Sequence, residues 1–406
     1  MDKSKKSLTV FFEDYLKKES IFINKKVLQE SYKPETIPHR EEHINELANI
    51  LAPILRMEKP SNIFMYGKTG TGKTLVSRYV TQNLLEIAEK NKFPVKIIYL
   101  NCKMKQTADT EYRLIAEITN QLGVKVPFTG LPTNEVYNMF LKALDKEKIL
   151  LLIILDEIDQ LVEKTGDELL YNLTRINSNL KQSEVSFIGI SNHTLFTENL
   201  DLRIKSSLAQ EEILFPPYNA MQLLKILESR SKLAFRDNVI GEGVLPKCAA
   251  YAARESGDAR KALDLLRVAG EITERKNELK ISIENLDLAE EKIERDKVQE
   301  IVEKLPKQSQ VSLLAIFNLE CDKNMDNIYT GSVYEEYKTL CMSLKIRPLT
   351  QRRISDIIAD LDMQGIIKTT IISQGRYGRT RKMNIAIPPS DIENTYNVLK
   401  GILNVS

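Results

Sequence analysis

The stretch NIFMYGKTGTGKT, residues 62–74, holds the residue types that bind phosphate groups, at the spacing G-x-x-x-x-G-K-[ST]. A short apolar strand pattern leads into it, and an amphipathic helix pattern, LVSRYVTQNLLEIA, follows it. Glycines let successive backbone N–H groups turn inward around phosphate oxygens, at a helix N-terminus whose dipole favours anions. The sequence therefore predicts a nucleotide-binding loop formed by Gly67, Lys68, Thr69, Gly70, Thr71, Gly72, Lys73, Thr74 and Leu75.

Four side chains should carry the chemistry of this site. Lys73 is expected to reach the β- and γ-phosphates, and the Thr74 hydroxyl to ligate Mg²⁺. Asp156 and Glu157 follow seven apolar residues in ILLLIILDEID, residues 149–159. Such a run is typical of a strand buried on both faces of a parallel sheet, whose carboxyl end is where ligands bind. We expect Asp156 to hold Mg²⁺ through water and Glu157 to orient or deprotonate the attacking water.

These groups together predict a nucleoside triphosphatase. The sequence contains no N-K-x-D guanine motif, so ATP is the expected nucleotide and ADP the product. A further polar side chain, Asn192, ends the apolar run VSFIGISN and should lie at the same edge of the sheet. It is placed to sense the γ-phosphate or the water, and a plain turn asparagine is the competing interpretation.

A second group of candidate residues lies near the end of the chain. Residues 345–382 carry nine basic and three acidic side chains, a local charge of +6, whereas the whole chain has a net charge of +2. Helical patterns at 308–320, 332–344 and 351–364 precede a hairpin pattern with the basic tip SQGRYGRTRK. Three helices and a hairpin predict a winged helix. Its expected DNA contacts are Arg347, Thr350, Gln351, Arg352, Arg353, Arg376, Tyr377, Arg379 and Arg381. A winged helix that binds protein is the alternative.

The elements that position these residues must belong to several domains. The chain has 406 residues, which is more than one hydrophobic core usually holds. Strand patterns at 95–100, 185–190 and 212–215 alternate with helical ones, which predicts a doubly wound α/β domain with a parallel sheet. We divide the chain into a basic tail (1–17), a nucleotide-binding base (18–216), a helical lid (217–295) and the winged-helix domain (296–406).

Composition excludes several other classes of protein. The four cysteines lie far apart and there are only three histidines, which argues against a disulfide framework and a zinc site and fits a reducing cytosol. The longest apolar run, Ile149 to Leu155, is too short to cross a bilayer, and the N-terminus lacks a signal-peptide pattern. We expect no membrane partner and a cytoplasmic, nucleoid-associated protein.

In their order along the chain, the motifs resemble those of AAA+ ATPases. The resemblance rests on the phosphate loop, LDEID, Asn192 as sensor 1, and SGDARKALDLL at 256–266. It implies that Arg260 is sensor 2, an arginine that a helical lid delivers to the γ-phosphate. The segment DLRIKSSL, 201–208, resembles one that carries an arginine finger, so Arg203 is implied to act on a neighbouring subunit's ATP. A structural salt bridge is the alternative for Arg203.

More narrowly, the chain resembles archaeal origin-recognition initiators of the Orc/Cdc type over nearly its whole length. Further segments that show this resemblance are YKPETIPHREEHINELANIL (32–51), DLRIKSSLAQEEILFPPYNAMQL (201–223) and GRYGRTRK (375–382). The long disordered extension of eukaryotic relatives is not found, which favours the archaeal group. One departure is Leu202, where the family pattern has proline. The resemblance implies adenine contacts from Tyr32, Pro38 and Arg40. It also implies that the segment 121–137 is an initiator-specific insertion that contacts DNA through Lys125, Phe128 and Thr129, with a simple helix connector as the alternative.

The function that this resemblance implies is an ATP-dependent replication initiator. It would bind duplex origin DNA, associate with other initiator subunits and help load the replicative helicase, and slow hydrolysis would act as a switch. Two alternatives stay open: a DNA motor of the branch-migration type, which also joins AAA+ to a winged helix, and a nucleotide-gated transcription or signalling regulator.

Overall fold

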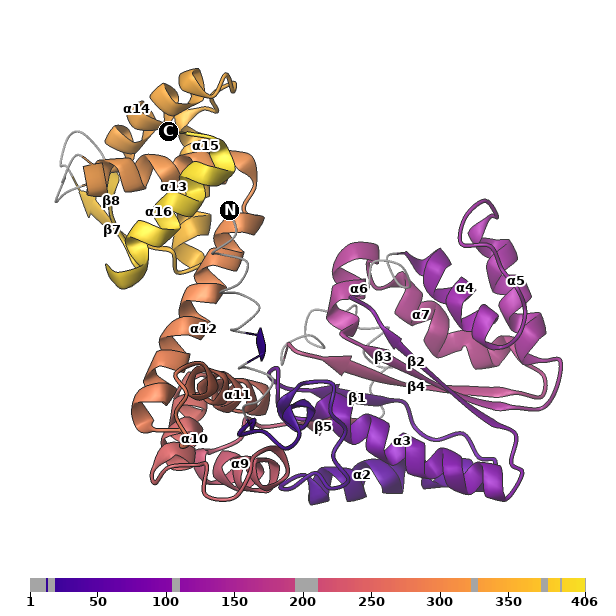
Figure 1. The fold of residues 1–406 in the computed structure, drawn as a ribbon. Coiled ribbons are helices and arrows are strands. Elements are labelled where there is room, and N and C mark those ends of the chain that lie inside the picture. The colour runs from indigo at the N-terminus through magenta and orange to yellow at the C-terminus, as the bar shows by residue number, and fades with distance from the viewer. Residues whose placement is uncertain are drawn as a thin grey trace. The chain divides into compact units, whose positions relative to one another are not determined.

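The structure is a computed structural model that describes residues 12–13, 19–103, 110–193, 211–322, 328–373, 379–387 and 389–405. The chain forms two compact units, Met1–Leu286 and Asp287–Ser406 (Figure 1). The boundary along the chain, after Leu286, falls within one helix, α12 (Ile283–Lys304). The predicted division between lid and winged helix, after residue 295, falls in the same helix.

A five-stranded parallel sheet forms the centre of the first unit. Its strands stand in the order β2-β3-β4-β1-β5, and each neighbouring pair is parallel. Because all the strands point the same way, their carboxyl ends share one edge, where ligands bind in such sheets. The predicted doubly wound α/β fold is confirmed. The strands are β1 (Ile63–Tyr66), β2 (Val95–Asn101), β3 (Leu150–Asp156), β4 (Glu184–Ser191) and β5 (Glu211–Leu214).

Helices cover both faces of this sheet, which explains the uninterrupted apolar run of β3. Leu151, Ile153 and Leu155 join one core cluster, and the alternate residues Leu150, Leu152 and Ile154 join the other. The first cluster packs under α4 (Glu111–Gln121), α5 (Thr133–Leu144), α6 (Ile158–Thr165) and α7 (Glu168–Arg175). The second packs against α2 (Glu41–Leu51), the short η2 (Ala52–Arg56) and α3 (Lys73–Lys90), on the opposite side in Figure 1. A short turn, η3 (Ile176–Asn179), leads into β4.

Three helices, α9 (Ala220–Ala234), α10 (Val244–Glu255) and α11 (Ala259–Arg275), form the lid. The α9 helix starts at a capping box between Asn219 and Gln222, in which each side chain bonds the other residue's backbone N–H. The N-terminal segment packs on this lid: the rings of Phe22 and Phe235 lie 4.7 Å apart, just before η1 (Lys25–Leu28). The N-terminal segment of the first unit therefore packs against the lid, which is the last part of that unit in the sequence.

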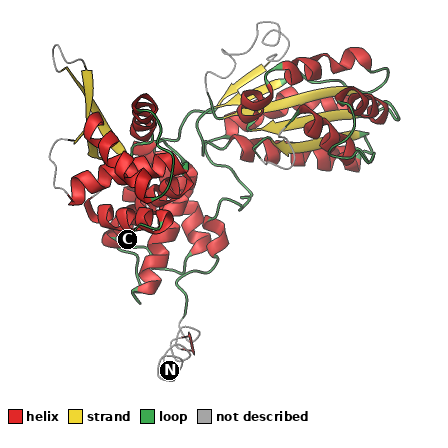
Figure 2. Cartoon of the chain, turned by 90° about the horizontal axis from the view of Figure 1, so that it is seen from above, coloured by secondary structure: helices red, strands yellow, loops and turns green. Residues whose placement is uncertain are grey.

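The second unit is a winged helix, as the sequence predicts (Figure 2). Its three predicted helices are α13 (Lys307–Phe317), which continues into the π-helical η5 (Asn318–Asp322), α14 (Thr330–Ser343) and α15 (Gln351–Met363). The hairpin strands β7 (Ile367–Ser373) and β8 (Arg379–Ile385) pair antiparallel. Two elements were not predicted: β6 (Ile328–Tyr329), which pairs with β8, and α16 (Pro389–Leu403), which packs on α13.

Among the described helices, none combines the length and the apolar character that crossing a membrane requires.

Candidate nucleotide site and nucleic-acid interface

The predicted phosphate loop joins β1 to α3 at the carboxyl edge of the sheet. Gly67 leaves no room for a side chain, because a Cβ there would lie 2.3 Å from the carbonyl oxygen of Phe215. Gly70 has a φ of +69°, in the left-handed region, and a Cβ there would lie 1.6 Å from Oδ1 of Asp258 in the lid. The two glycines thus let the loop pack against both the end of β5 and the lid.

Lys73, the first residue of α3, is buried within the loop with 5% of its surface exposed. Its Nζ donates hydrogen bonds to the carbonyl oxygens of Gly67 at 2.7 Å and Lys68 at 2.8 Å. An ammonium has three donors, and these bonds account for two of them. Burial lowers the pKa of Lys73 to about 8, and the nearby Asp156 carboxylate opposes that shift. The cation therefore lies where phosphate oxygens would complete its coordination.

Thr74 and Asp156 lie side by side, as a shared magnesium site requires. The Thr74 hydroxyl donates to Oδ2 of Asp156 at 2.8 Å. Asp156 is 5% exposed, and its Oδ1 accepts a bond of 3.0 Å from the backbone N–H of Glu157. A hydroxyl and a carboxylate are the hard oxygen donors that Mg²⁺ prefers. The donor set fits the predicted metal.

Sequence reasoning missed Tyr99, whose hydroxyl donates to the same Oδ2 of Asp156. Tyr99 lies near the end of β2, next to β3, and the guanidinium of Arg78 lies 4.0 Å from the centre of its ring. Burial, and then the Asp156 charge, raises the pKa of Tyr99, so its hydroxyl remains a donor. A polar side chain two residues before the end of an apolar strand was the available signal.

Glu157 has an unusual backbone for its residue type, with a φ of +54° in the left-handed region. Non-glycine residues held there store strain, and such residues are concentrated at functional sites. The Glu157 side chain is 23% exposed, and its Oε2 lies 3.8 Å from Nζ of Lys103, just beyond β2. The carboxylate is therefore reachable from solvent beside the buried Asp156.

Asn192 follows β4, the strand between β3 and β1, so it lies at the edge where the loop and Asp156 are. Its backbone N–H donates to Oδ1 of Asp159 at 3.4 Å, and Nε2 of His193 lies 3.7 Å from Oδ2 of the same carboxylate. The buried Asp159 thus fixes the turn after β4. Sensing of phosphate by the Asn192 side chain stays a prediction.

The lid brings Arg260 next to the phosphate loop. Asp258 caps α11 by accepting from the backbone N–H groups of Arg260 and Lys261, and the Ala259 N–H donates to the carbonyl of Gly70 at 3.3 Å. The Arg260 guanidinium forms an ion pair with Glu30, at 2.5 Å. The start of α11 therefore touches the loop, although contact between Arg260 and a γ-phosphate stays a prediction.

The three predicted adenine contacts have different surroundings. Tyr32 is half-buried beneath the guanidinium of Arg230, 4.5 Å from its ring centre, and Pro38 is half-buried. Arg40 is only 2% exposed, and its Nε donates to the carbonyl oxygen of Thr71 in the phosphate loop at 2.9 Å. Contact with a base stays a prediction for all three. The predicted finger, Arg203, and its neighbour Leu202 lie outside the described residues.

In the winged helix, Thr350 caps α15 as predicted, because its side chain accepts from the backbone N–H of Arg353. Arg347, Gln351, Arg352 and Arg353 are exposed around the start of that helix. On the second wing strand, Nη1 of Arg381 donates to the carbonyl oxygen of Ser355 in α15 at 2.9 Å. Arg379 lies on β8, whereas Arg376 and Tyr377 are outside the described residues.

The predicted insertion, residues 121–137, covers the loop between α4 and α5 and the first residues of α5, and Lys125, Phe128 and Thr129 are all exposed on that loop. The loop is held by local bonds: the Asn120 side chain bonds both the N–H and the carbonyl of Val126, and the Tyr112 hydroxyl donates to the carbonyl of Pro127. Phe128 is 45% exposed, which is unusual for an aromatic ring. DNA binding by this loop stays a prediction.

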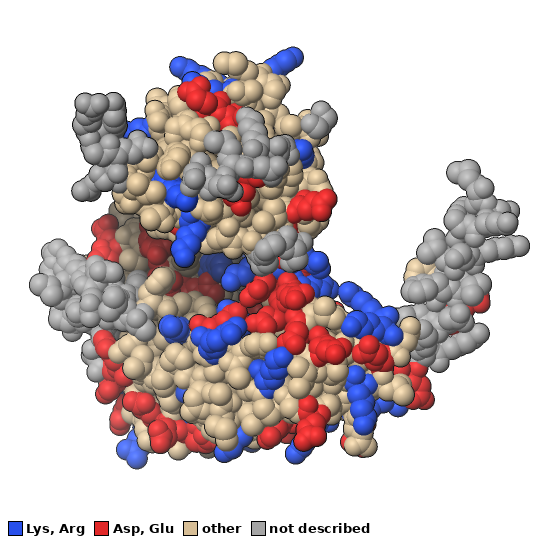
Figure 3. All heavy atoms as spheres, turned by 90° about the vertical axis from the view of Figure 1, so that its left-hand side faces the viewer, with Lys and Arg blue, Asp and Glu red and all other residues tan. Residues whose placement is uncertain are grey.

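On the one face drawn in Figure 3, basic and acidic side chains are mixed rather than segregated. Lysine and arginine side chains lie there among aspartates and glutamates. With a net charge of only +2, a DNA-binding surface has to come from local groups of basic residues, such as those exposed at the start of α15.

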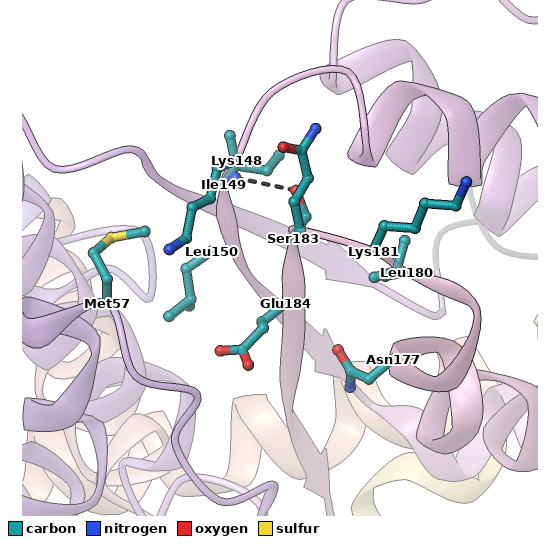
Figure 4. Close-up of a pocket in the computed structure, with 10 residues that line it drawn as sticks. Met57, Lys148, Ile149, Leu150, Asn177, Leu180, Lys181, Ser183 and Glu184 are labelled. Atoms are coloured by element: carbon teal, nitrogen blue, oxygen red, sulfur yellow. Dashed lines mark hydrogen bonds between the residues drawn. The ribbon is translucent and has the colours of Figure 1, made fainter.

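A separate pocket of about 410 Å³ lies at the opposite edge of the sheet (Figure 4). Leu150 and Glu184, the first residues of β3 and β4, line it, together with the neighbouring Ser183. The Ser183 hydroxyl accepts from the Ile149 N–H at 3.1 Å and donates to the Leu144 carbonyl at 2.7 Å. Because β3 begins here and ends at Asp156, this pocket is not part of the nucleotide site.

Three family models match successive parts of the chain. They describe an AAA domain at residues 56–194, a Cdc6 AAA+ ATPase-type lid domain at 224–291, and a CDC6 C-terminal winged helix domain at 300–395. The order of these domains is the order that the sequence motifs predict.

Known proteins are similar to the chain over nearly its whole length. The ORC1-type DNA replication protein of Pyrococcus abyssi is 50% identical over 98% of this chain and 96% of that protein. The ORC1-type DNA replication protein 1 of Methanosarcina acetivorans is 48% identical over 97% and 94%.

Solved structures agree with this similarity. The Aeropyrum pernix ORC1 protein, solved in complex with DNA, has a TM-score of 0.82 and 45% identity, covering 94% of this chain and 97% of that one. Cdc6p from Pyrobaculum aerophilum, at 22% identity, shares the fold with a TM-score of 0.59, over 95% and 99% of the two chains. The expected resemblance is confirmed, and the chain belongs to the family of archaeal ORC1-type DNA replication proteins.

Proposed function

We propose that this protein is an ATP-dependent initiator of DNA replication that binds duplex origin DNA. The observation that carries the proposal is that one chain joins a phosphate loop, with its Thr74–Asp156 pair, to a winged helix whose recognition helix exposes basic residues at its start. Close similarity to a protein solved in complex with DNA supports the same conclusion.

In the nucleotide site, each residue has one role. Lys73 binds the β- and γ-phosphates, Thr74 and Asp156 hold Mg²⁺, and Glu157 orients or deprotonates water. The metal would supply charge neutralisation for the phosphates. Asn192 and Arg260 sense the γ-phosphate, and Arg203 acts on a neighbouring subunit's ATP. Hydrolysis to ADP is slow and acts as a switch of DNA binding.

On DNA, α15 enters the major groove through its N-terminal residues, where Gln351, Arg352 and Arg353 are exposed. Arginines of the wing contact phosphates or a narrow minor groove, in which negative potential is enhanced. The exposed Lys125, Phe128 and Thr129 add contacts from the ATPase domain. Two separate surfaces of one chain thereby read one origin.

The partners of the protein follow from this role. It associates with other initiator subunits on origin DNA and helps load the replicative helicase. It acts at the nucleoid, in the cytoplasm of an archaeal cell.

The test is footprinting of the full-length protein, with ATP, ADP or neither, across the replication starts of its own genome. Protection concentrated at those starts and dependent on nucleotide is the expected result. Protection at gene promoters alone would instead indicate a transcription regulator. A stable hexamer whose turnover rises steeply with DNA of any sequence would indicate a motor.

A further inference from the structure

Arg40 is a buried cation that contacts the phosphate loop. It precedes α2 and is 2% exposed. Its Nε donates to the carbonyl of Thr71 at 2.9 Å, and its Nη2 to the carbonyl of Pro216 at 2.6 Å. Its guanidinium also lies 4.0 Å from the centre of the Tyr218 ring. Burying a charge is costly unless hydrogen bonds or an opposite charge compensate it, and burial here lowers the pKa of Arg40.

The bond to Thr71 has a consequence for phosphate binding. In a trans peptide unit the carbonyl and the following N–H point in opposite directions. Fixing the Thr71 carbonyl on Arg40 therefore turns the N–H of Gly72 away from Arg40, as a phosphate-binding loop requires. The guanidinium also adds positive charge next to the loop, which favours an anion in it.

The other contacts of Arg40 connect the loop to the lid. Residues 216–218 join β5 to α9, the first lid helix. The backbone N–H of Tyr218 donates to the carbonyl of Gly257 at 3.1 Å, and Gly257 directly precedes the α11 cap at Asp258. The Tyr218 hydroxyl also packs on Gly72, 3.0 Å from where a Cβ would be. Contacts thus run from the loop through Arg40 and Tyr218 to the helix that carries Arg260.

We propose that Arg40 is a positioning residue, which orients the Thr71–Gly72 peptide of the phosphate loop and couples that loop to the start of the lid. A lysine cannot replace it, because only the planar guanidinium reaches two carbonyl oxygens and a tyrosine ring at once. This role follows from backbone contacts and differs from the adenine contact that the resemblance implies.

Because this inference rests on the proposed nucleotide binding, its test compares full-length variants with a binding-competent wild type. The variants are Arg40→Lys, which keeps the charge, and Arg40→Met, which keeps the approximate length. Arg267→Lys is the matched control: Arg267 is another arginine of this unit, partly buried, whose partners are Asp264 and Glu271. Affinity for fluorescent ATP and ADP analogues is measured together with hydrogen–deuterium exchange, with and without nucleotide.

The expected result is that Arg40→Lys binds both nucleotides at least about tenfold more weakly. At saturating nucleotide it should also lose the nucleotide-dependent protection of residues 216–218 and 256–262, while Arg267→Lys keeps both. A purely structural role would lower the unfolding temperature with this protection unchanged. If Arg40→Met fails to fold, Arg40→Lys still decides the question.

Two outcomes would overturn the inference. If Arg40→Lys binds within twofold of wild type and keeps full protection of 256–262, only the role of Arg40 is wrong. If the wild-type chain itself binds neither nucleotide, the proposed function is wrong as well.

Discussion

Thr74 and Asp156 lie 82 positions apart in the chain, yet the hydroxyl of the first donates to the carboxylate of the second at 2.8 Å. They come from the start of α3 and the end of β3, which share the carboxyl edge of the sheet. These two side chains would hold a magnesium ion, and the Lys73 ammonium is fixed within the neighbouring loop by its bonds to the carbonyl oxygens of Gly67 and Lys68.

Replacing Thr74 by valine should remove the hydroxyl at little cost in volume. We expect ATP affinity in the presence of Mg²⁺ to fall about tenfold or more, because the substitution removes a metal ligand. When EDTA removes the metal, the same substitution should cost less affinity. Titration with a fluorescent ATP analogue measures both. The control is Thr81→Val, in the same helix, whose hydroxyl bonds the Ser77 carbonyl. Equal effects of the two substitutions would rule out a metal role for Thr74.

Tyr99→Phe removes one donor from Asp156 while keeping the ring beneath Arg78. Partners that orient a metal ligand typically change metal affinity by roughly 10–100-fold, so the Mg²⁺ concentration for half-maximal ATP binding should rise within that range. Tyr79→Phe, in the neighbouring α3, is a control for loss of a tyrosine hydroxyl. An unchanged Mg²⁺ dependence would show that Asp156 is held well enough by its other donors.

Glu157→Gln should leave ATP bound but not hydrolysed, because the loop, Thr74 and Asp156 remain while water activation is lost. Single-turnover hydrolysis should fall about 100-fold or more, with ATP affinity within about threefold of wild type. The exposed Glu163→Gln in α6 serves as control. Equal hydrolysis rates for Glu157→Gln and wild type would contradict the role assigned to Glu157.

The ion pair between Arg260 and Glu30 predicts opposite effects of two substitutions. Arg260→Ala should reduce the preference for ATP over ADP and alter hydrolysis. Glu30→Gln should free the guanidinium and raise that preference, by no more than about fivefold because a half-exposed ion pair is worth about 0–1 kcal/mol. The ratio of the two dissociation constants measures this. Glu255→Gln, which breaks the Lys261 pair, is the matched control. If Arg260→Ala leaves affinity, turnover and solution scattering unchanged, Arg260 is a structural residue.

DNA binding by the winged helix has two separable parts. Alanine at Arg376, Arg379 and Arg381 together should weaken every duplex similarly. It should also reduce the slope of log K against log salt by about 0.9 for each phosphate that an arginine no longer neutralises. Arg352→Ala should cost about 1–3 kcal/mol on the preferred site and little on random DNA. Nucleotide binding should survive all of these changes.

The control for these DNA measurements is Lys400→Ala in α16, whose ammonium lies over the Tyr396 ring. Because Arg381 also bonds the Ser355 carbonyl, Arg381→Ala alone should loosen the wing as well as remove a charge. Unaltered affinity and salt slope in the triple variant would assign the basic tip to another partner.

Much of the fold could be predicted because its signals are local. The apolar run of β3 indicates burial on both faces, the glycine spacing of residues 67–72 indicates a phosphate loop, and Thr350 before a periodic segment indicates a helix start. Each signal depends on residues within a few positions of one another. Two elements were missed: β6 has only two residues, too few to show a period, and α16 lies beyond the three helices and the hairpin that the winged-helix interpretation required.

Which of these residues meet was decided by tertiary structure alone. The strand order β2-β3-β4-β1-β5 sets β2 beside β3, so Tyr99 reaches Asp156 57 positions away, and no periodicity records that order. The contact of Arg40 with Pro216 spans 176 positions and depends on how β5 returns beside β1. A side chain's type and spacing predict the chemistry it can do. Its partners are set by the packing of distant segments, because burial of the whole apolar surface selects one arrangement of strands.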